Sequence, residues 1–492
     1  MVKIKDGGHI YFLGIGGTGM AAVAGLAQKA GYKVTGSDQG IYPPMSTMLE
    51  ELGIPVRSPY SAENLQAARP DLVVVANALS RGNPEVEALL ESGRAYTSFP
   101  GLLEEYFLPG RSPVVVAGTH GKTTTSSIMA HVLVFLGEDP GYFIGGLPKN
   151  FEHSFHPGSG APFVLEGDEY DTAFFDKNSK FLHYRPRHLI LNNLEFDHAD
   201  IFKDLAAIES QFENLLQLVE QPTRVVVNID DPGILKLAER VLGAGTFTRV
   251  SATGNGTASV RVVDSFPLQQ DSLPATRIRL HTRLWGDLGL ETGLTGRHNL
   301  ANIAQVVACL ENLCESDDLQ QQPSASAVTE AIRSFRGVAR RMDHLGRVGH
   351  TDIFEDFAHH PTAVGLVIDG FRKAWPDRRL CVAFDPRNAT SRRNIFTDEY
   401  ARALGKADRI YIGVCPTDER IPADQRMNTT AMAAKIGTRA TAFQDNEELL
   451  SQMGDETTDG DGIIFMSSGS FSGIQYRLEN LLQKKFSLPK IE

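Results

Sequence analysis

The sequence has few of the features that mark secreted, membrane or nucleic-acid-binding proteins. Its 492 residues include only four cysteines, with no Cys-x-x-Cys pair. This excludes a disulfide framework and predicts reduced thiols in a cytoplasmic protein. No apolar run approaches about 18 residues, and the first residues lack a signal-peptide pattern, so we expect no membrane insertion. The net charge of −12 argues against nucleic acid as a partner, because such binding requires a basic face.

Short apolar strands alternate with helical stretches along the chain, which is typical of α/β domains with parallel sheets. The length favours about three domains. Pro109, Gly110 and Pro113 mark a hinge, and a last unit begins near residue 338. We therefore predict α/β domains at residues 1–111, 112–337 and 338–492. Alternating apolar and polar residues within 258–285 predict an antiparallel extension of the middle domain.

The first glycine-rich loop, GIGGTG at residues 14–19, lies between a predicted strand and a predicted helix. Asp38 ends the next predicted strand, about twenty residues later, as in dinucleotide-binding βαβ units. Glycines at these positions let a diphosphate approach a helix N-terminus, whatever group the diphosphate carries. The pattern therefore fits NAD, another nucleotide diphosphate, or a tight turn without a ligand.

The second loop, GTHGKTT at residues 118–124, also joins a predicted strand to a predicted helix. It resembles a phosphate-binding loop, although only two residues separate its glycines where the common pattern has four. Lys122 would meet the β- and γ-phosphates of ATP, and Thr123 would offer its hydroxyl to Mg²⁺. A dehydrogenase has little use for such a loop, whereas a reaction that consumes ATP needs one.

Two acidic clusters follow apolar stretches and provide candidate metal ligands. The first contains Glu166, Asp168, Glu169 and Asp171, and the second contains Glu195, Asp197 and His198. Clusters of this kind hold Mg²⁺ in some proteins and are solvated loops in others. Further along, Asn299 and Asn302 share one helix face, where they either read an adenine edge or cap the helix.

His359 and His360 are adjacent before Pro361. Neighbouring residues of an extended segment point to opposite faces. We therefore do not expect these two histidines to form a zinc pair.

The motifs GTHGKTTT, NLEFDH, GRHNLAN, RRMDHLG and EDFAHHP occur in this order, together with a glutamate after an apolar strand. In this respect the chain resembles the Mur ligases, in the branch that uses UDP-N-acetylmuramate. The resemblance implies a Rossmann-like N-terminal domain for the UDP-sugar, a central P-loop ATPase-like domain, and a Rossmann-like C-terminal domain for the amine substrate.

The resemblance also implies the activity, an ATP-dependent carbon–nitrogen ligase of cytoplasmic peptidoglycan metabolism that works through an acyl phosphate. The stretches YPPMST and EGDEYDTAFFDKNSKFLHY favour the tripeptide L-Ala-γ-D-Glu-meso-diaminopimelate as the amine, in peptidoglycan recycling. The alternative amine is L-alanine, in biosynthesis. An NAD-dependent dehydrogenase and a non-catalytic UDP-sugar sensor are further alternatives. We expect small-molecule partners only, and a monomer or a homodimer.

The resemblance assigns roles to residues at matching positions. The catalytic set is Lys122, Glu166, His198 and His359. The ATP set is Gly118, Thr119, His120, Gly121, Lys122, Thr123, Thr124, Asn299, Asn302, Arg341 and Asp356. The Mg²⁺ set is Thr123, Glu166 and His198. The UDP-sugar set is Gly14, Gly16, Gly17, Thr18, Gly19, Asp38 and Asn77. Arg387 is the expected partner of a carboxylate on the amine substrate.

Overall fold

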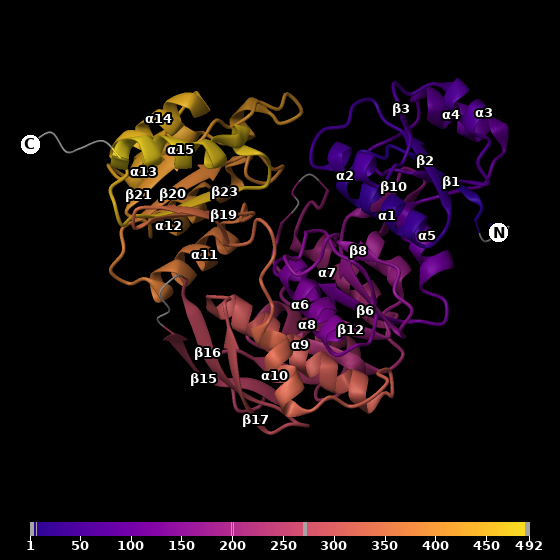
Figure 1. Cartoon of the computed structure of the whole chain (residues 1–492), viewed down its shortest axis with the longest axis horizontal. Coiled ribbons are helices and arrows are strands. Elements are labelled where there is room, and N and C mark those ends of the chain that lie inside the picture. The colour runs from indigo at the N-terminus through magenta and orange to yellow at the C-terminus, as the bar shows by residue number, and fades with distance from the viewer. Residues whose placement is uncertain (1–3, 6, 198, 200, 269–272, 488–492) are drawn as a thin grey trace, which may run out of the picture.

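The computed structural model describes residues 4–5, 7–197, 199, 201–268 and 273–487 of the chain. Within these residues, three large sheets with flanking helices form three lobes (Figure 1). The indigo N-terminal lobe and the yellow C-terminal lobe lie above the middle lobe in that view. This arrangement confirms the predicted three-domain α/β fold. No helix of the described part is both long and apolar enough to cross a bilayer.

The N-terminal lobe is a parallel sheet with the strand order β3-β2-β1-β4-β5. Strands β1 and β4 are buried along their whole length, as expected for a sheet with both faces covered. The β1-α1-β2 unit confirms the predicted βαβ fold around the first glycine loop. The elements are β1 His9–Leu13, α1 Thr18–Lys29, β2 Lys33–Ser37, α2 Met45–Glu51, β3 Val56–Arg57, α3 Ala62–Ala68, β4 Leu72–Val75, α4 Pro84–Ser92, β5 Tyr96–Thr97, α5 Phe99–Leu102 and η1 Leu103–Phe107.

The middle lobe holds a ten-stranded sheet with the order β17-β16-β15-β14-β13-β12-β6-β9-β7-β8. Strands β15, β16 and β17 pair antiparallel, which confirms the predicted extension. The two-stranded ribbon β10–β11, absent from the sequence expectations, lies beside the N-terminal lobe (Figure 1). The elements are β6 Ser112–Ala117, α6 Lys122–Phe135, β7 Gly141–Phe143, β8 Phe155–His156, β9 Pro162–Gly167, β10 Asp171–Ala173, β11 Asp176–Ser179, η2 Lys180–Tyr184, β12 His188–Leu191, α7 Leu205–Gln217, η3 Pro222–Arg224, β13 Val225–Asn228, α8 Pro232–Leu242, β14 Thr248–Ser251, β15 Val260–Leu268, β16 Ala275–His281, β17 Asp287–Thr292, α9 Arg297–Glu315 and α10 Ala325–Arg333.

The C-terminal lobe holds a six-stranded sheet with the order β18-β19-β23-β20-β21-β22, in which only the edge strand β18 is antiparallel among the described strands. The elements are β18 Asp343–Val348, β19 Thr351–Asp356, α11 Pro361–Ala374, β20 Leu380–Asp385, η4 Asn394–Phe396, α12 Thr397–Leu404, β21 Arg409–Ile412, η5 Ala423–Gln425, α13 Thr429–Ile436, β22 Ala440–Ala442, α14 Asn446–Glu456, β23 Gly462–Ser467, η6 Phe471–Gly473 and α15 Ile474–Ser487.

Several helices begin at capping residues that are visible in the sequence. The Asp231 side chain accepts a hydrogen bond from the Ile234 amide at 2.8 Å, and proline occupies the first position of α8. Asn83 caps α4 in the same way. These side chains accept amide hydrogens that have no partner inside the helix, so they fix where the helices start.

One hydrophobic core joins the N-terminal and middle lobes. The Phe99 and Phe143 rings meet edge to face, with centroids 5.7 Å apart. Phe155 lies so close to α1 that a Cβ at Gly25 would stand 2.3 Å from its ring. The C-terminal lobe has separate core clusters. The first two lobes therefore form one packed unit. We retain the divisions after residues 111 and 337 as proposals, because both lie between strands of different sheets.

A histidine between two carboxylates also connects these two lobes. The His183 ring in η2 lies 2.8 Å from Glu104 of η1 through Nδ1 and 2.7 Å from Asp176 through Nε2. Burial opposes a positive charge on this ring, but the hydrogen bonds and charges of Glu104 and Asp176 outweigh it and raise the pKa of His183. The two carboxylates therefore favour the charged form of the imidazole at this junction.

We predict that His183→Gln lowers stability by about 2 kcal/mol below pH 6.5, because it removes hydrogen bonds between charged groups. A histidine with a raised folded pKa stabilises fully below its unfolded pKa, and this contribution is lost as pH rises through the folded pKa. The gap in melting temperature between wild type and variant should therefore shrink from pH 6 to 9. His350→Gln, in an exposed pair with Asp459, should change little. A gap independent of pH would contradict this account.

Candidate active site

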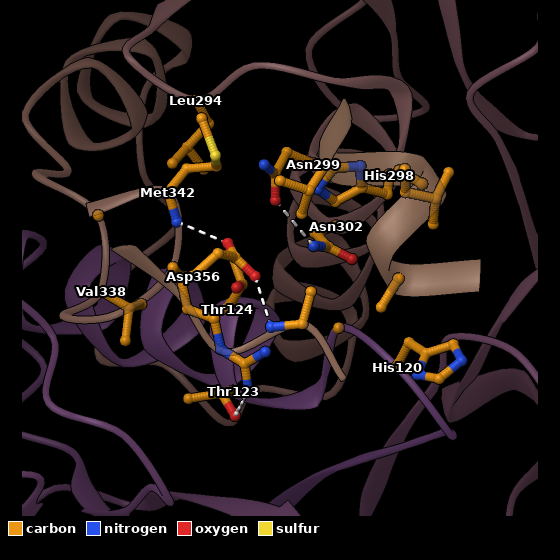
Figure 2. A pocket seen from close by; sticks show the side chains of 18 of the residues that line it. His120, Thr123, Thr124, Leu294, His298, Asn299, Asn302, Val338, Met342 and Asp356 are labelled. Atoms are coloured by element: carbon orange, nitrogen blue, oxygen red, sulfur yellow. Dashed lines mark hydrogen bonds between the residues drawn. The ribbon is translucent and has the colours of Figure 1, made fainter. Parts of the chain in front are cut away.

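A cavity of about 870 Å³ lies between the middle and C-terminal lobes. Its wall is formed by the second glycine loop, the ends of β9 and β12, the start of α9, and segments at residues 341–344 and 354–360 (Figure 2). The glycine loop and the ends of β9 and β12 lie at the carboxyl edge of a parallel sheet, where α/β proteins bind ligands. The volume is within the range of small-molecule sites.

The short glycine loop is fixed by two asparagines after β12. The Asn193 side chain accepts a hydrogen bond from the His120 amide at 2.8 Å, and the Asn192 side chain donates to the His120 carbonyl at 3.0 Å. Gly118 and Gly121 both have positive φ, and a Cβ on either would stand within 2.8 Å of Asn192. Only glycine therefore allows the loop to approach β12 so closely.

Lys122 and Thr123 begin α6, and both side chains are buried among carboxylates. The Lys122 ammonium donates to the Gly118 carbonyl at 2.8 Å and pairs with Glu169 at 3.0 Å. Burial opposes its charge, but Glu169, Asp168 and Glu166 outweigh this and raise the pKa of Lys122. The amine is therefore a fixed cation at the loop, as phosphate binding requires.

Thr123 and Glu166 provide the donor set that Mg²⁺ prefers. The Thr123 hydroxyl donates to Glu166 Oε1 at 2.8 Å, and Glu166 Oε2 accepts the Gly145 amide at 2.7 Å. Burial and the charge of Asp168 raise the pKa of Glu166. A divalent cation would relieve this crowding of negative charge, and oxygen ligands suit Mg²⁺. The described residues thus fit the ion; the predicted third ligand, His198, lies outside the described residues.

The expected nucleotide-side residues surround the same cavity (Figure 2). Asn299 and Asn302 project from α9, and the Asn302 amide donates to Asn299 Oδ1 at 3.2 Å. Asp356 accepts the amides of Met342 and Ala358, both at 2.7 Å. Arg341, from the C-terminal lobe, donates to the Thr123 hydroxyl at 3.3 Å. The structure therefore brings the ATP set together from two lobes, while the individual roles remain predictions.

His359 and His360 face different neighbours, as the sequence argument expected. His359 Nδ1 lies 2.9 Å from its local carbonyl at Phe357, and Nε2 lies 3.8 Å from Asp197. His360 is almost fully buried at the start of α11 and faces Glu195. Burial and neighbouring His120 lower the pKa of His360 to about 4, so its ring is neutral at pH 7.

The predicted UDP-sugar residues gather at one edge of the N-terminal sheet. The loop of residues 14–19 follows β1, Asp38 follows β2 and Asn77 follows β4. Asp38 accepts the Gly16 amide at 2.7 Å, so this carboxylate supports the loop directly. Asn77 donates to Asp171 of the ribbon at 2.9 Å, which closes this edge against the middle lobe. None of these N-terminal residues lines the cavity between the middle and C-terminal lobes.

Arg387 follows β20 in the C-terminal lobe, away from the wall of the ATP cavity. Its guanidinium pairs with the buried Asp385 at 2.8 Å and lies directly against Gly469. In the same loop, Thr390 donates to Asp197 of the middle lobe at 2.7 Å. This loop therefore faces the middle lobe.

Comparisons with known proteins identify the family. Models of the Mur ligase catalytic, middle and glutamate ligase domains match residues 9–108, 116–310 and 340–469. An Escherichia coli protein named UDP-N-acetylmuramate–L-alanyl-γ-D-glutamyl-meso-2,6-diaminoheptandioate ligase is 37% identical, covering 97% of this chain and 99% of its own. The chain belongs to the Mur ligase family.

Two further relatives carry names that refer to different amine substrates. A solved murein peptide ligase of Psychrobacter arcticus is 34% identical, with a TM-score of 0.71, and the match covers 97% of this chain and 99% of that one. A UDP-N-acetylmuramate–L-alanine ligase of Methylibium petroleiphilum is 31% identical, covering 96% of this chain and 98% of its own. The predicted ATP-dependent ligase class is therefore confirmed, and the dehydrogenase alternative is not supported.

Sequence reasoning missed several residues that shape the site of this Mur ligase. Asn192 and Asn193 hold the phosphate loop, although the double asparagine before the acidic cluster is visible in the sequence. His298 lines the cavity beside Asn299, and burial together with the charge of Arg341 lowers its pKa to about 4. The residues themselves are visible in the sequence, but the contacts that give them a role join segments far apart in the chain. No local pattern therefore indicates those roles.

We predict that Arg341→Ala raises the KM for ATP by about 10- to 100-fold, because it removes a charged hydrogen-bond donor from the cavity. The KM for the amine should stay within about threefold of wild type. Arg477→Ala, in an exposed ion pair with Glu447, is the matched control and should change neither constant. An equal effect on both substrates in steady-state kinetics would show that Arg341 only positions the lobes.

Proposed function

We propose that this Mur ligase joins UDP-N-acetylmuramate to the tripeptide L-alanyl-γ-D-glutamyl-meso-diaminopimelate with hydrolysis of ATP, in peptidoglycan recycling. The observation that carries the proposal is the 37% identity, over nearly the whole of both chains, to the Escherichia coli ligase whose name states these substrates. The L-alanine ligase alternative is less supported, because its first relative is 31% identical. Since both nucleotide substrates occur in the cytoplasm, we place the reaction there, with a monomer or homodimer as the acting species.

The chemistry requires activation of a poor electrophile. The lactyl carboxylate of the sugar attacks the γ-phosphorus of ATP, which releases ADP and leaves an acyl phosphate. The free amine of the tripeptide then attacks the acyl carbon, and phosphate leaves as the amide bond forms. Since no covalent enzyme intermediate occurs, the work of the protein is positioning and charge stabilisation.

The residues of the cavity suit these steps. Lys122 supplies a fixed positive charge where the phosphates would lie, and Arg341 adds a second charge from the C-terminal lobe. Thr123, Glu166 and His198 would hold Mg²⁺, which neutralises phosphate charge when bound. His359, close to Asp197, would accept the proton of the attacking amine. Closure of the lobes around the substrates would exclude water from the acyl phosphate.

The decisive measurement is phosphate release from ATP in the presence of UDP-N-acetylmuramate and Mg²⁺, with either the tripeptide or L-alanine as the amine. We expect turnover with the tripeptide and little with L-alanine. Turnover with L-alanine alone would assign the biosynthetic reaction. Lys122→Met should lower kcat by about 100- to 1,000-fold. Lys435→Met, on an exposed surface, should retain wild-type activity.

We further predict that Arg387→Ala raises the KM for the tripeptide by about 10- to 100-fold, because a charged hydrogen bond to a substrate carboxylate is lost. The KM for ATP should not change. Arg387→Lys keeps the charge but loses the planar fork, so its defect should be intermediate. A normal tripeptide KM in Arg387→Ala, with the fold intact by circular dichroism, would place the amine site elsewhere.

A further inference from the structure

Three side chains outside the expected magnesium set converge beside the phosphate loop. His120 belongs to that loop, Glu195 follows β12, and His360 precedes α11. Glu195 Oε2 lies 3.3 Å from His120 Nε2 and 3.6 Å from His360 Nδ1. One ligand atom from each residue lies within 4.8 Å of the others. Four-coordinate zinc, with bonds of about 2.0–2.2 Å, requires ligand atoms about 3.3–3.6 Å apart. The two distances from Glu195 already match this spacing, and the two histidine nitrogens lie within 4.8 Å of each other.

The donor types differ from those at Thr123 and Glu166. Two imidazole nitrogens and one carboxylate oxygen suit zinc and related transition metals, whereas Mg²⁺ prefers oxygen ligands throughout. Three protein ligands leave a fourth position for water or substrate. This set therefore selects a different class of ion from the predicted magnesium set.

The His360 imidazole is not committed to a strong hydrogen bond. The residue is only 4% exposed, and its Nε2 has no hydrogen-bond partner among the described residues. Its Nδ1 faces Glu195 and receives only a long contact of 3.4 Å from the Thr362 amide. Nδ1, the nitrogen nearest Glu195, is therefore held only weakly by the protein and is available to a metal ion as a neutral donor.

A second cavity also reaches the cluster. Its volume is about 480 Å³, and its lining includes Glu195 and His360 together with Phe396. Glu195 and His360 belong to the walls of both cavities. The cluster therefore lies where two cavities adjoin, and an ion could reach it from either one.

We propose that His120, Glu195 and His360 form a binding site for a divalent transition metal of the zinc class, and that the bound ion links the middle and C-terminal lobes. His120 and Glu195 belong to the middle lobe, and His360 belongs to the C-terminal lobe. The reason for excluding a zinc pair at His359 and His360 still holds, because only His360 takes part. Its partners come from segments that a sequence pattern does not bring together.

The test is titration of Zn²⁺ into metal-free full-length protein by calorimetry, in millimolar Mg²⁺ so that the Thr123 and Glu166 set is saturated. Co²⁺ is the second probe, because a four-coordinate site gives it intense visible absorption. We expect one equivalent to bind to wild type and to Glu166→Gln. Binding should weaken at least about 100-fold in His360→Asn and in Glu195→Gln. Bound Zn²⁺ should also raise the melting temperature of wild type.

His281→Asn is the matched control, because it removes a histidine from an exposed pair with Asp287, and it should bind like wild type. Loss of binding in Glu166→Gln but not in His360→Asn would place the ion in the predicted magnesium set and overturn the proposal. Affinity weaker than about 100 µM in wild type would also overturn it. These readouts do not depend on ligase activity, so they stand apart from the test of the proposed function.

Discussion

The contact between the short phosphate loop and the asparagines after β12 is the constraint on which the ATP side of the structure depends. The loop has only two residues between its glycines. Asn192 and Asn193 hold it from outside through the carbonyl and amide of His120. Because α6 begins directly after the loop, this contact also sets where Lys122 and Thr123 stand relative to the carboxylates on β9 and beyond.

The three lobes are joined in two different ways. The N-terminal and middle lobes share one hydrophobic core, with aromatic rings packed across the junction. The C-terminal lobe meets the middle lobe mainly through polar side chains at the cavity, such as Arg341 on Thr123 and Thr390 on Asp197. A shared hydrophobic core resists relative motion more strongly than a few side-chain hydrogen bonds do. We therefore expect the C-terminal lobe, and not the N-terminal lobe, to move when ATP binds.

Electrostatics around the phosphate loop follow from burial of many like charges in a small volume. Glu166, Asp168 and Glu169 surround one ammonium, and burial raises the pKa of Glu166 although Lys122 opposes this. Such a site binds cations and phosphates together more readily than either alone, because each relieves the charge of the other. Holding these carboxylates together raises the electrostatic free energy of the empty site, and a bound cation lowers it again.

The sequence by itself determined the three α/β units, the two glycine loops and the family, because these depend on local patterns. Strand–helix alternation and glycine spacing are visible in short stretches of sequence. Each family motif is also short, and their order can be read directly along the chain. Strand β18 and the ribbon β10–β11 were missed, since short edge strands carry little periodic signal. Only the tertiary structure decided that Asn192 and Asn193 hold the phosphate loop. It also decided that His360, and not His359, lies beside Glu195. Side chains from distant segments become neighbours through strand order and lobe packing, and no local pattern encodes those distances.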